Sequence, residues 1–255
     1  MIKRHLIPFA VGLVGVLAFA TACNAAGGTR PPAAAGSSSA APSPTADARD
    51  DLVKALQRSS AVAHTFSVRA DLPAGGRIKG TGAIDLKAKR FQTAMTATGV
   101  RFPGAGSRIV IGTDSYHRES GDDGWVHVDL KRVRPEDTLL AFDWTDPTGI
   151  KTIAGAIGRV ERTGPHTYTG RVDPDAGKTE PYLPVGAPAL ISIGMNMSPF
   201  TATTDAEGWV TSIVVELIPR DGKKLTMTTT MSGHGKPLAV KKPARFDEAA
   251  EFYYS

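Results

Sequence analysis

The chain has 255 residues, a formal net charge of +5 at pH 7 and a single cysteine, Cys23. One cysteine excludes an internal disulfide, so the stability of a folded domain must come from its hydrophobic core. No run of Lys or Arg with interleaved aromatic residues occurs, and the sequence therefore gives no support to nucleic-acid binding.

The first 22 residues have the pattern of an export signal. Lys3 and Arg4 precede the apolar run Leu6–Ala22, which ends in small residues. Residues 1–22 are therefore predicted to be a signal peptide. An uncleaved membrane anchor also fits, although the run of 17 residues is slightly shorter than the roughly 20 that a spanning helix needs.

The cysteine follows this segment directly. Ala20-Thr21-Ala22-Cys23 resembles a bacterial lipobox, with alanine where leucine is usual. The resemblance implies that Cys23 is lipidated, becomes the mature N-terminus and holds the protein on the extracytoplasmic side of the cell membrane. A plain cleaved signal, which would make this a secreted protein, remains the alternative.

Residues 23–46 are predicted to be the lipidated N-terminus and a disordered linker. Ala, Gly, Ser and Pro dominate this segment, so it buries too little apolar surface to offset the entropy of ordering. A flexible chain of this length spans roughly 25–30 Å on average. We expect it to tether a folded domain, residues 47–255, close to the membrane.

The folded domain begins with a predicted helix and continues with strands. Leu52, Val53 and Leu56 recur at helical spacing, and from Thr65 the hydrophobic period changes to two. Alternating patterns then predict strands at 65–72, 78–86, 91–97, 108–112, 115–119, 125–130, 159–163, 167–173, 200–204, 209–217 and 224–231.

A helical stretch interrupts the strands in the middle of the chain. Pro135 is placed like a first-turn proline before Leu139 and Phe142, and Asp146-Pro147 reads as an N-cap followed by an N1 proline. The second helix would carry a single apolar stripe, formed by Ile150, Ile153, Ala154 and Ile157.

About eleven strands with one apolar face must close, stack on another sheet or curl around other elements. Two helices with apolar stripes are available for the last arrangement. We therefore predict an α+β fold, an unclosed antiparallel β half-barrel wrapped around helices.

Several stretches match a known family in order and spacing. They are Ser60-Ala61-Val62-Ala63-His64-Thr65-Phe66-Ser67-Val68, Gly80-Thr81-Gly82-Ala83-Ile84-Asp85, the hairpin from Ile111-Gly112-Thr113-Asp114-Ser115-Tyr116 to Gly124-Trp125, Asp146-Pro147, and Asp205-Ala206-Glu207-Gly208-Trp209-Val210. With the lipobox, they resemble the actinobacterial LppX/LprA/LprF/LprG lipoproteins of the LolA-like superfamily. The resemblance covers roughly residues 48–250 and contains no catalytic signature. It implies a LolA-like lipid-binding domain that holds an acylated ligand between sheet and helices, with no cofactor and no chemistry.

Candidate ligand-binding residues lie on the helical stripe and on the apolar side of the strands. They are Met95, Leu139, Phe142, Trp144, Ile150, Ile153, Ile157, Met227 and Met231. Unbranched, polarizable methionine adapts to a flexible acyl chain, but the same residues also serve as ordinary core filler. Trp144 would line the cavity mouth or make a helix–sheet packing contact, and Gly80 and Gly82 would leave space or let the sheet bend.

Signals for an enzyme or a metal site are missing from the sequence. Histidines such as His64, His117 and His127 are scattered without metal-ligand spacing and are interpreted as surface residues. No nucleophile elbow or phosphate-binding loop occurs.

Two functions follow as expectations. One is a carrier of lipids, glycolipids or lipoproteins with a pocket of several hundred Å³, working with a membrane transporter or envelope protein. The other is an envelope sensor that binds a partner protein and has a filled core.

Overall fold

The computed structural model describes residues 46–72, 75–101, 103–119, 124–134, 137, 140–173, 197–217 and 224–254. All of them belong to one compact unit, Pro42–Ser255. The predicted signal peptide, Cys23, most of the linker and Leu139 lie outside the described residues.

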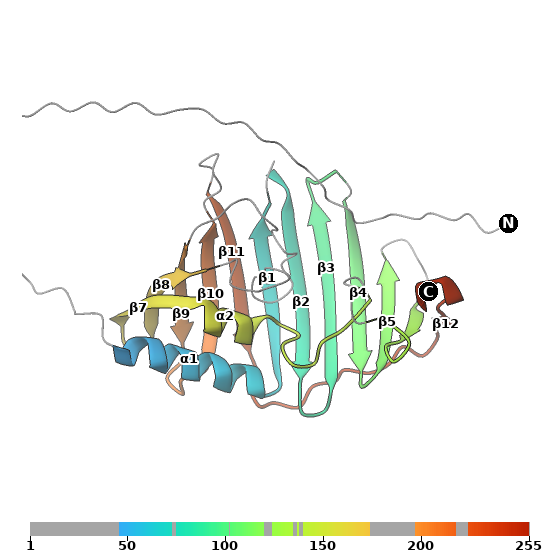
Figure 1. The fold of residues 1–255 in the computed structure, drawn as a ribbon, viewed down its shortest axis with the longest axis horizontal. Coiled ribbons are helices and arrows are strands. Elements are labelled where there is room, and N and C mark those ends of the chain that lie inside the picture. The colour runs from blue at the N-terminus through green and yellow to red at the C-terminus, as the bar shows by residue number, and fades with distance from the viewer. Residues whose placement is uncertain are drawn as a thin grey trace, which may run out of the picture. The chain divides into compact units, whose positions relative to one another are not determined.

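The described chain forms two α-helices, twelve strands and a short 3₁₀-helix (Figure 1). In chain order they are α1 (Ala46–Ala61), β1 (His64–Asp71), β2 (Arg77–Asp85), β3 (Arg90–Thr98), β4 (Gly104–Ile111), β5 (Asp114–Glu119), β6 (Val126–Asp129), α2 (Ile150–Ala156), β7 (Ile157–Gly164), β8 (Thr167–Val172), β9 (Ser198–Thr204), β10 (Val210–Leu217), β11 (Leu225–Ser232), β12 (Asp247–Glu248) and η2 (Glu251–Tyr254).

All twelve strands belong to a single sheet in the order β12-β6-β5-β4-β3-β2-β1-β11-β10-β9-β8-β7. Neighbours are antiparallel except β12, which pairs in parallel with β6. β7 and β12 are the two ends of this order, so the described sheet is unclosed, as the sequence predicts.

The strand count, the start of β4 and the first central helix differ from the predictions. β12 is the additional strand, and its two residues carry no readable alternation. β4 begins at Gly104 rather than at Arg108. The prediction missed its first residues, Gly-Ala-Gly-Ser, because they lack the apolar side chains that mark a strand. Residues 140–142 are not helical, in contrast to the predicted first central helix.

The second central helix is shorter than predicted. α2 begins at Ile150 after Gly149, whose φ is 70°, and Ile157 is already the first residue of β7. Asp146 is nevertheless a cap, because its carboxylate accepts hydrogen bonds from the backbone N–H groups of Lys151 and Thr152 at 3.1 and 2.8 Å. The aspartate acts from four residues before the helix instead of at the N-cap position.

The two helices lie against the same face of the sheet, called here the inner face (Figure 1). α1 contacts α2, β7 and β10, and it buries Leu52 and Leu56, which are four residues apart and therefore share one helix side. Along β1 the buried Phe66 and Val68 face inward, whereas Thr65 and Ser67 face the opposite, outer face. No described helix is both long and apolar enough to cross a membrane.

Candidate functional site

The predicted ligand-binding residues within the described part of the chain all lie on one hydrophobic cluster of the inner face. Five are buried members of the cluster: Ile150, Ile153, Ile157, Met227 and Met231. Three are partly buried and pack against it: Met95, Phe142 and Trp144. The structure thus brings eight of the nine predicted residues to one apolar body, and the ninth, Leu139, lies outside the described residues.

The contact between the helices and the sheet is tightly packed. Its void has a volume of about 10 Å³ and is lined by Leu52, Leu56, Ile153, Ile157, Val172, Phe200, Ala202, Ile213 and Val215. A cavity needs roughly 10–15 Å³ to hold a single water molecule. The expected pocket of several hundred Å³ is therefore not open at Ile153 and Ile157, and an acyl chain could enter only if side chains or helices moved.

Side chains of neighbouring strands occupy the space above Gly80 and Gly82. A Cβ atom on Gly80 would lie 1.9 Å from the Met95 sulfur, and one on Gly82 would lie 2.1 Å from Cζ of Phe66. The two glycines therefore let a methionine and a phenylalanine lie flat on the sheet. The space that the sequence indicates exists, and the protein itself fills it.

Phe142 and Trp144 form an aromatic group at the β3–β5 part of the inner face. The Phe142 ring lies 5.0 Å from Phe91 of β3 and 4.7 Å from Trp144, measured between ring centroids. The Trp144 indole N–H donates to the carbonyl of Gly112 in the β4–β5 turn at 2.9 Å. Trp144 thus makes a packing contact with the sheet, which is one of the two roles that the sequence left open.

A polar network that the sequence did not reveal holds Leu140 and Ala141, the residues before Phe142, in place. Arg108 of β4 donates to the carbonyl of Leu140 at 2.6 Å and, through Nε, to the Ser115 hydroxyl at 3.0 Å. That hydroxyl lies 2.8 Å from Nε2 of His117. Burial and the charge of Arg108 lower the pKa of His117 to about 3, so the imidazole is neutral and shares one hydrogen bond with the serine hydroxyl. The network orients Arg108 toward the backbone that carries Phe142.

The interpretation of the histidines as surface residues is wrong for His64. Its side chain is fully buried, and its ring stacks on His234 at 5.6 Å between centroids. His234 in turn stacks on Trp209, and Arg58 of α1 covers the indole ring at 3.8 Å. This stack joins the end of α1 to the start of β1, the end of β11 and the start of β10, which lie at the same end of these antiparallel strands. Among the described residues, no group of three or more His, Cys, Asp or Glu is placed to hold a metal ion.

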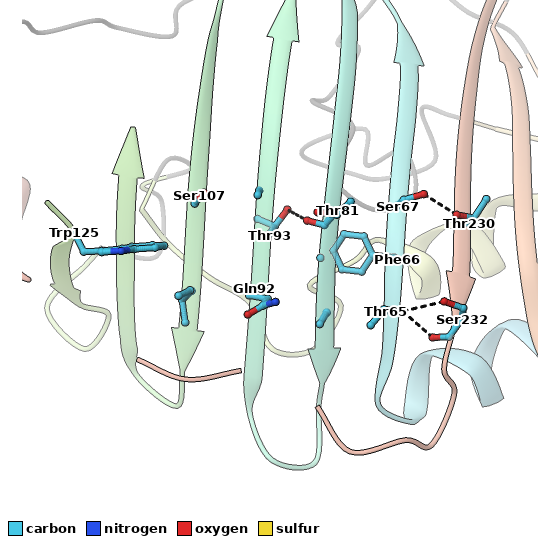
Figure 2. A pocket seen from close by; sticks show the side chains of 14 residues that line it. Thr65, Phe66, Ser67, Thr81, Gln92, Thr93, Ser107, Trp125, Thr230 and Ser232 are labelled. Carbon is cyan, nitrogen blue, oxygen red and sulfur yellow. Dashed lines mark hydrogen bonds between the residues drawn. The ribbon is translucent and has the colours of Figure 1, made fainter. Parts of the chain in front are cut away.

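A second hollow lies on the other face of the sheet. It has a volume of about 560 Å³, and none of the predicted ligand-binding residues lines it (Figure 2). The sequence did not predict this groove. Its polar side chains occupy every second position of neighbouring strands, and in a sequence such positions look like ordinary solvent-facing ones.

Comparison with known proteins adds little to the description of this chain. No protein-family model matches the chain. No curated protein matches it either. A solved structure with some likeness is a LolA superfamily protein from Nitrosomonas europaea, which is 7% identical, with a TM-score of 0.26 over 82% of this chain and 97% of that one. A likeness of this strength does not assign the chain to a fold family.

Proposed function

We propose that this chain is a LolA-like carrier, without catalytic activity, that binds an acylated lipid, a glycolipid or a lipoprotein on the inner face of its sheet. The observation that carries the proposal is the single apolar cluster that runs across the inner face from α1 and α2 to Met95 on β3. The sequence resemblance described above and the unclosed sheet with both helices on one face support it.

Binding between the helices and the sheet requires a rearrangement. The free energy that it costs is smaller than the free energy gained by burying an acyl chain. A buried methylene group contributes about 0.8 kcal/mol, so an acyl chain with about 15 of them gains roughly 12 kcal/mol. Exposing one Leu or Ile side chain costs about 1.5–3 kcal/mol. An acyl chain could therefore displace the contacts of α2, whose buried residues are Ile150, Ile153 and Ala154, and still bind.

Uptake of a fluorescent fatty acid by the purified full-length chain tests this placement. Ile153→Asp puts a charge into the contact between helix and sheet and is expected to abolish uptake. Ile153→Met keeps the position apolar, and Lys151→Asp places the same charge on the exposed side of α2, so both should take up the probe like the wild type. Retained uptake by a folded Ile153→Asp variant would contradict the placement.

We also propose that Cys23 anchors the protein on the extracytoplasmic side of the cell membrane. Cys23→Ala is expected to move the protein from the membrane fraction to the soluble fraction after cell lysis, because the acyl chains have no other attachment point. Ser37→Ala in the linker is the matched control. Membrane retention of the Cys23→Ala protein would show that the anchor lies elsewhere.

The packed helix–sheet contact favours a second candidate, an envelope sensor that binds a partner protein. A filled core is the feature that distinguishes this function from the carrier, and the void of about 10 Å³ agrees with it. A partner strand is not expected to pair with the β7 edge of the sheet, because β7 exposes an ion pair between Arg159 and Glu161 that discourages strand addition. The two candidates differ in whether the purified protein contains lipid.

A further inference from the structure

The groove on the outer face crosses the strands from one side to the other. Trp125, just before β6, lies at one end, and Thr230 and Ser232 of β11 lie at the other (Figure 2). Six strand spacings separate β6 from β11 in the sheet order, which is about 29 Å at about 4.8 Å per spacing. The volume of about 560 Å³ lies within the range of roughly 300–1,000 Å³ that is usual for ligand sites. The shape is that of a site for an elongated molecule.

The groove is hollow because its floor consists of small side chains. Ala83, Ala94, Ser67 and Ser107 occupy outward-facing positions on neighbouring strands, in the register of the β1–β4 pairs. The exposed Ala94 lies in the middle strand of this floor, on β3. The larger outward-facing side chains of the strands, Gln92 and Ile109, lie in the next row, so a ligand can lie directly on the small side chains of Ser67, Thr81, Ala94 and Ser107, which the pairing register places side by side.

None of the lining residues is ionisable, and Arg118, which covers the Trp125 ring, stands beside the groove at that end. Seven of its outward-facing side chains bear a hydroxyl or an amide, whereas the lining residues Phe66, Gly82 and Thr93 face inward by register. Two hydroxyl pairs are already oriented, Thr65 with Ser232 at 3.0 Å and Ser67 with Thr230 at 2.7 Å. Because each hydroxyl offers one donor and two acceptor positions, these pairs keep free capacity for a ligand. Such a surface suits a neutral ligand with many hydroxyl groups.

An aromatic ring completes the groove at one end. The Arg118 guanidinium lies 4.8 Å from the centre of the Trp125 ring, and the Trp125 carbonyl accepts a hydrogen bond from the Asp247 N–H at 2.8 Å. The guanidinium thus covers one face of the indole, the hydrogen bond fixes the Trp125 backbone, and the ring still lines the groove. A broad aromatic face next to hydroxyl groups offers apolar contact to the C–H side of a sugar ring and hydrogen bonds to its edge.

We propose that this groove binds a linear neutral oligosaccharide, lying across the strands with one sugar unit at Trp125. Other occupants fit less well. An alkyl chain would cover hydroxyl and amide groups without giving them hydrogen bonds, a nucleic acid would need cations among the lining residues, and an added peptide strand would need unpaired backbone groups, which the interior of a sheet face does not present. The site is independent of the lipid-binding function proposed for the inner face.

Calorimetric titration of the full-length chain in a sugar-free detergent tests this inference. The probes are linear gluco- and manno-oligosaccharides of one to six units. Affinity is expected to rise with chain length, because a longer chain contacts more of the groove. Trp125→Ala should weaken binding about tenfold or more. Ala94→Arg and Ser107→Arg should abolish binding by blocking the floor. Thr169→Arg, on the outer face of β8 and outside the groove, should bind like the wild type.

Three results would overturn the inference. One is the absence of binding by every oligosaccharide at millimolar concentrations. A second is binding that Ala94→Arg and Ser107→Arg both leave unchanged in folded protein. The third is an affinity that does not increase beyond one unit, which would indicate recognition of a single sugar, such as a lipid headgroup, instead of a chain. None of these experiments depends on lipid uptake, so the inner-face proposal can fail or hold separately.

Discussion

Gly80 and Gly82 show how single backbone positions shape the inner face. Both face inward on β2, and both are overlaid by a side chain from a neighbouring strand. They differ in what a methyl group would meet. Above Gly80 it meets the end of the flexible Met95 side chain, whereas above Gly82 it meets the rigid Phe66 ring and the Gln92 carbonyl at 2.5 Å. The two positions therefore tolerate a larger residue to different degrees.

Gly82→Ala is expected to lower the free energy of unfolding by about 1–3 kcal/mol, because overpacking forces the ring and the strand apart. Gly80→Ala should cost less, because Met95 can swing away. Urea denaturation of both variants measures the difference. Gly82→Ala should cost less in a Phe66→Leu background than in the wild type, since the ring is removed and the carbonyl contact remains. An equal loss in the two single variants would contradict this account.

Residue patterns predicted the apolar contacts better than the polar ones. The inward positions of Met95, Met227 and Met231 follow from the period of two. The Arg108–Ser115–His117 network has no such signal, because its members belong to two strands and come together only through the β4–β5 pairing. The burial of His64 likewise depends on His234, 170 residues further along the chain.

At the scale of elements, a histidine between two carboxylates fastens the last part of the chain to the sheet. His127 of β6 lies 2.7 Å from a Glu248 carboxylate oxygen of β12 and 2.9 Å from one of Asp114. Burial alone would lower the pKa of His127, but the hydrogen bonds and charges of the two carboxylates outweigh it and raise the pKa. The backbone N–H groups of Asp247 and Ala249 donate to Trp125 and His127 at the same place.

This fastening should weaken as the pH rises. The pKa of His127 is higher in the folded than in the unfolded protein, so its contribution is complete below about pH 6.5 and is lost as the pH passes the raised value. Hydrogen exchange at the Asp247 and Ala249 amides, corrected for intrinsic rates, should accelerate over that range. Glu248→Gln should move the change to lower pH, and Glu251→Gln, which loses the pair with Arg132, should leave it in place. Exchange that does not change with pH would contradict the role of His127.

Elements in which a hydrophobic pattern repeats over many residues could be predicted from sequence. Elements that form only because another strand pairs with them could not. α1 and most strands carry clear patterns. β12 exists because β6 offers it a pairing edge, and the start of β4 is set by its pairing with β3, although Gly104 and Gly106 have no side chain to show it. Ile157 fits a helical stripe equally well, and only the pairing with Val172 places it in β7.

At the scale of the whole molecule, the two faces of one sheet have different chemistry. The inner face is apolar and carries both helices, and the groove of the outer face is lined by hydroxyl and amide groups without charge. The period of two produces this division along each strand, and the pairing register aligns it across the sheet. The proposed lipid and sugar sites therefore lie on opposite sides of the same strands.

The state of the inner face in the cell decides between a carrier and a sensor. Native mass spectrometry of the full-length chain, purified from its own membranes without added lipid and followed by organic extraction, measures this state directly. The account predicts a bound species with the mass of an acylated lipid, beyond the anchor itself, that extraction removes and that Ile153→Asp lacks. A single mass for the lipid-free protein, unchanged by extraction, would contradict the carrier function.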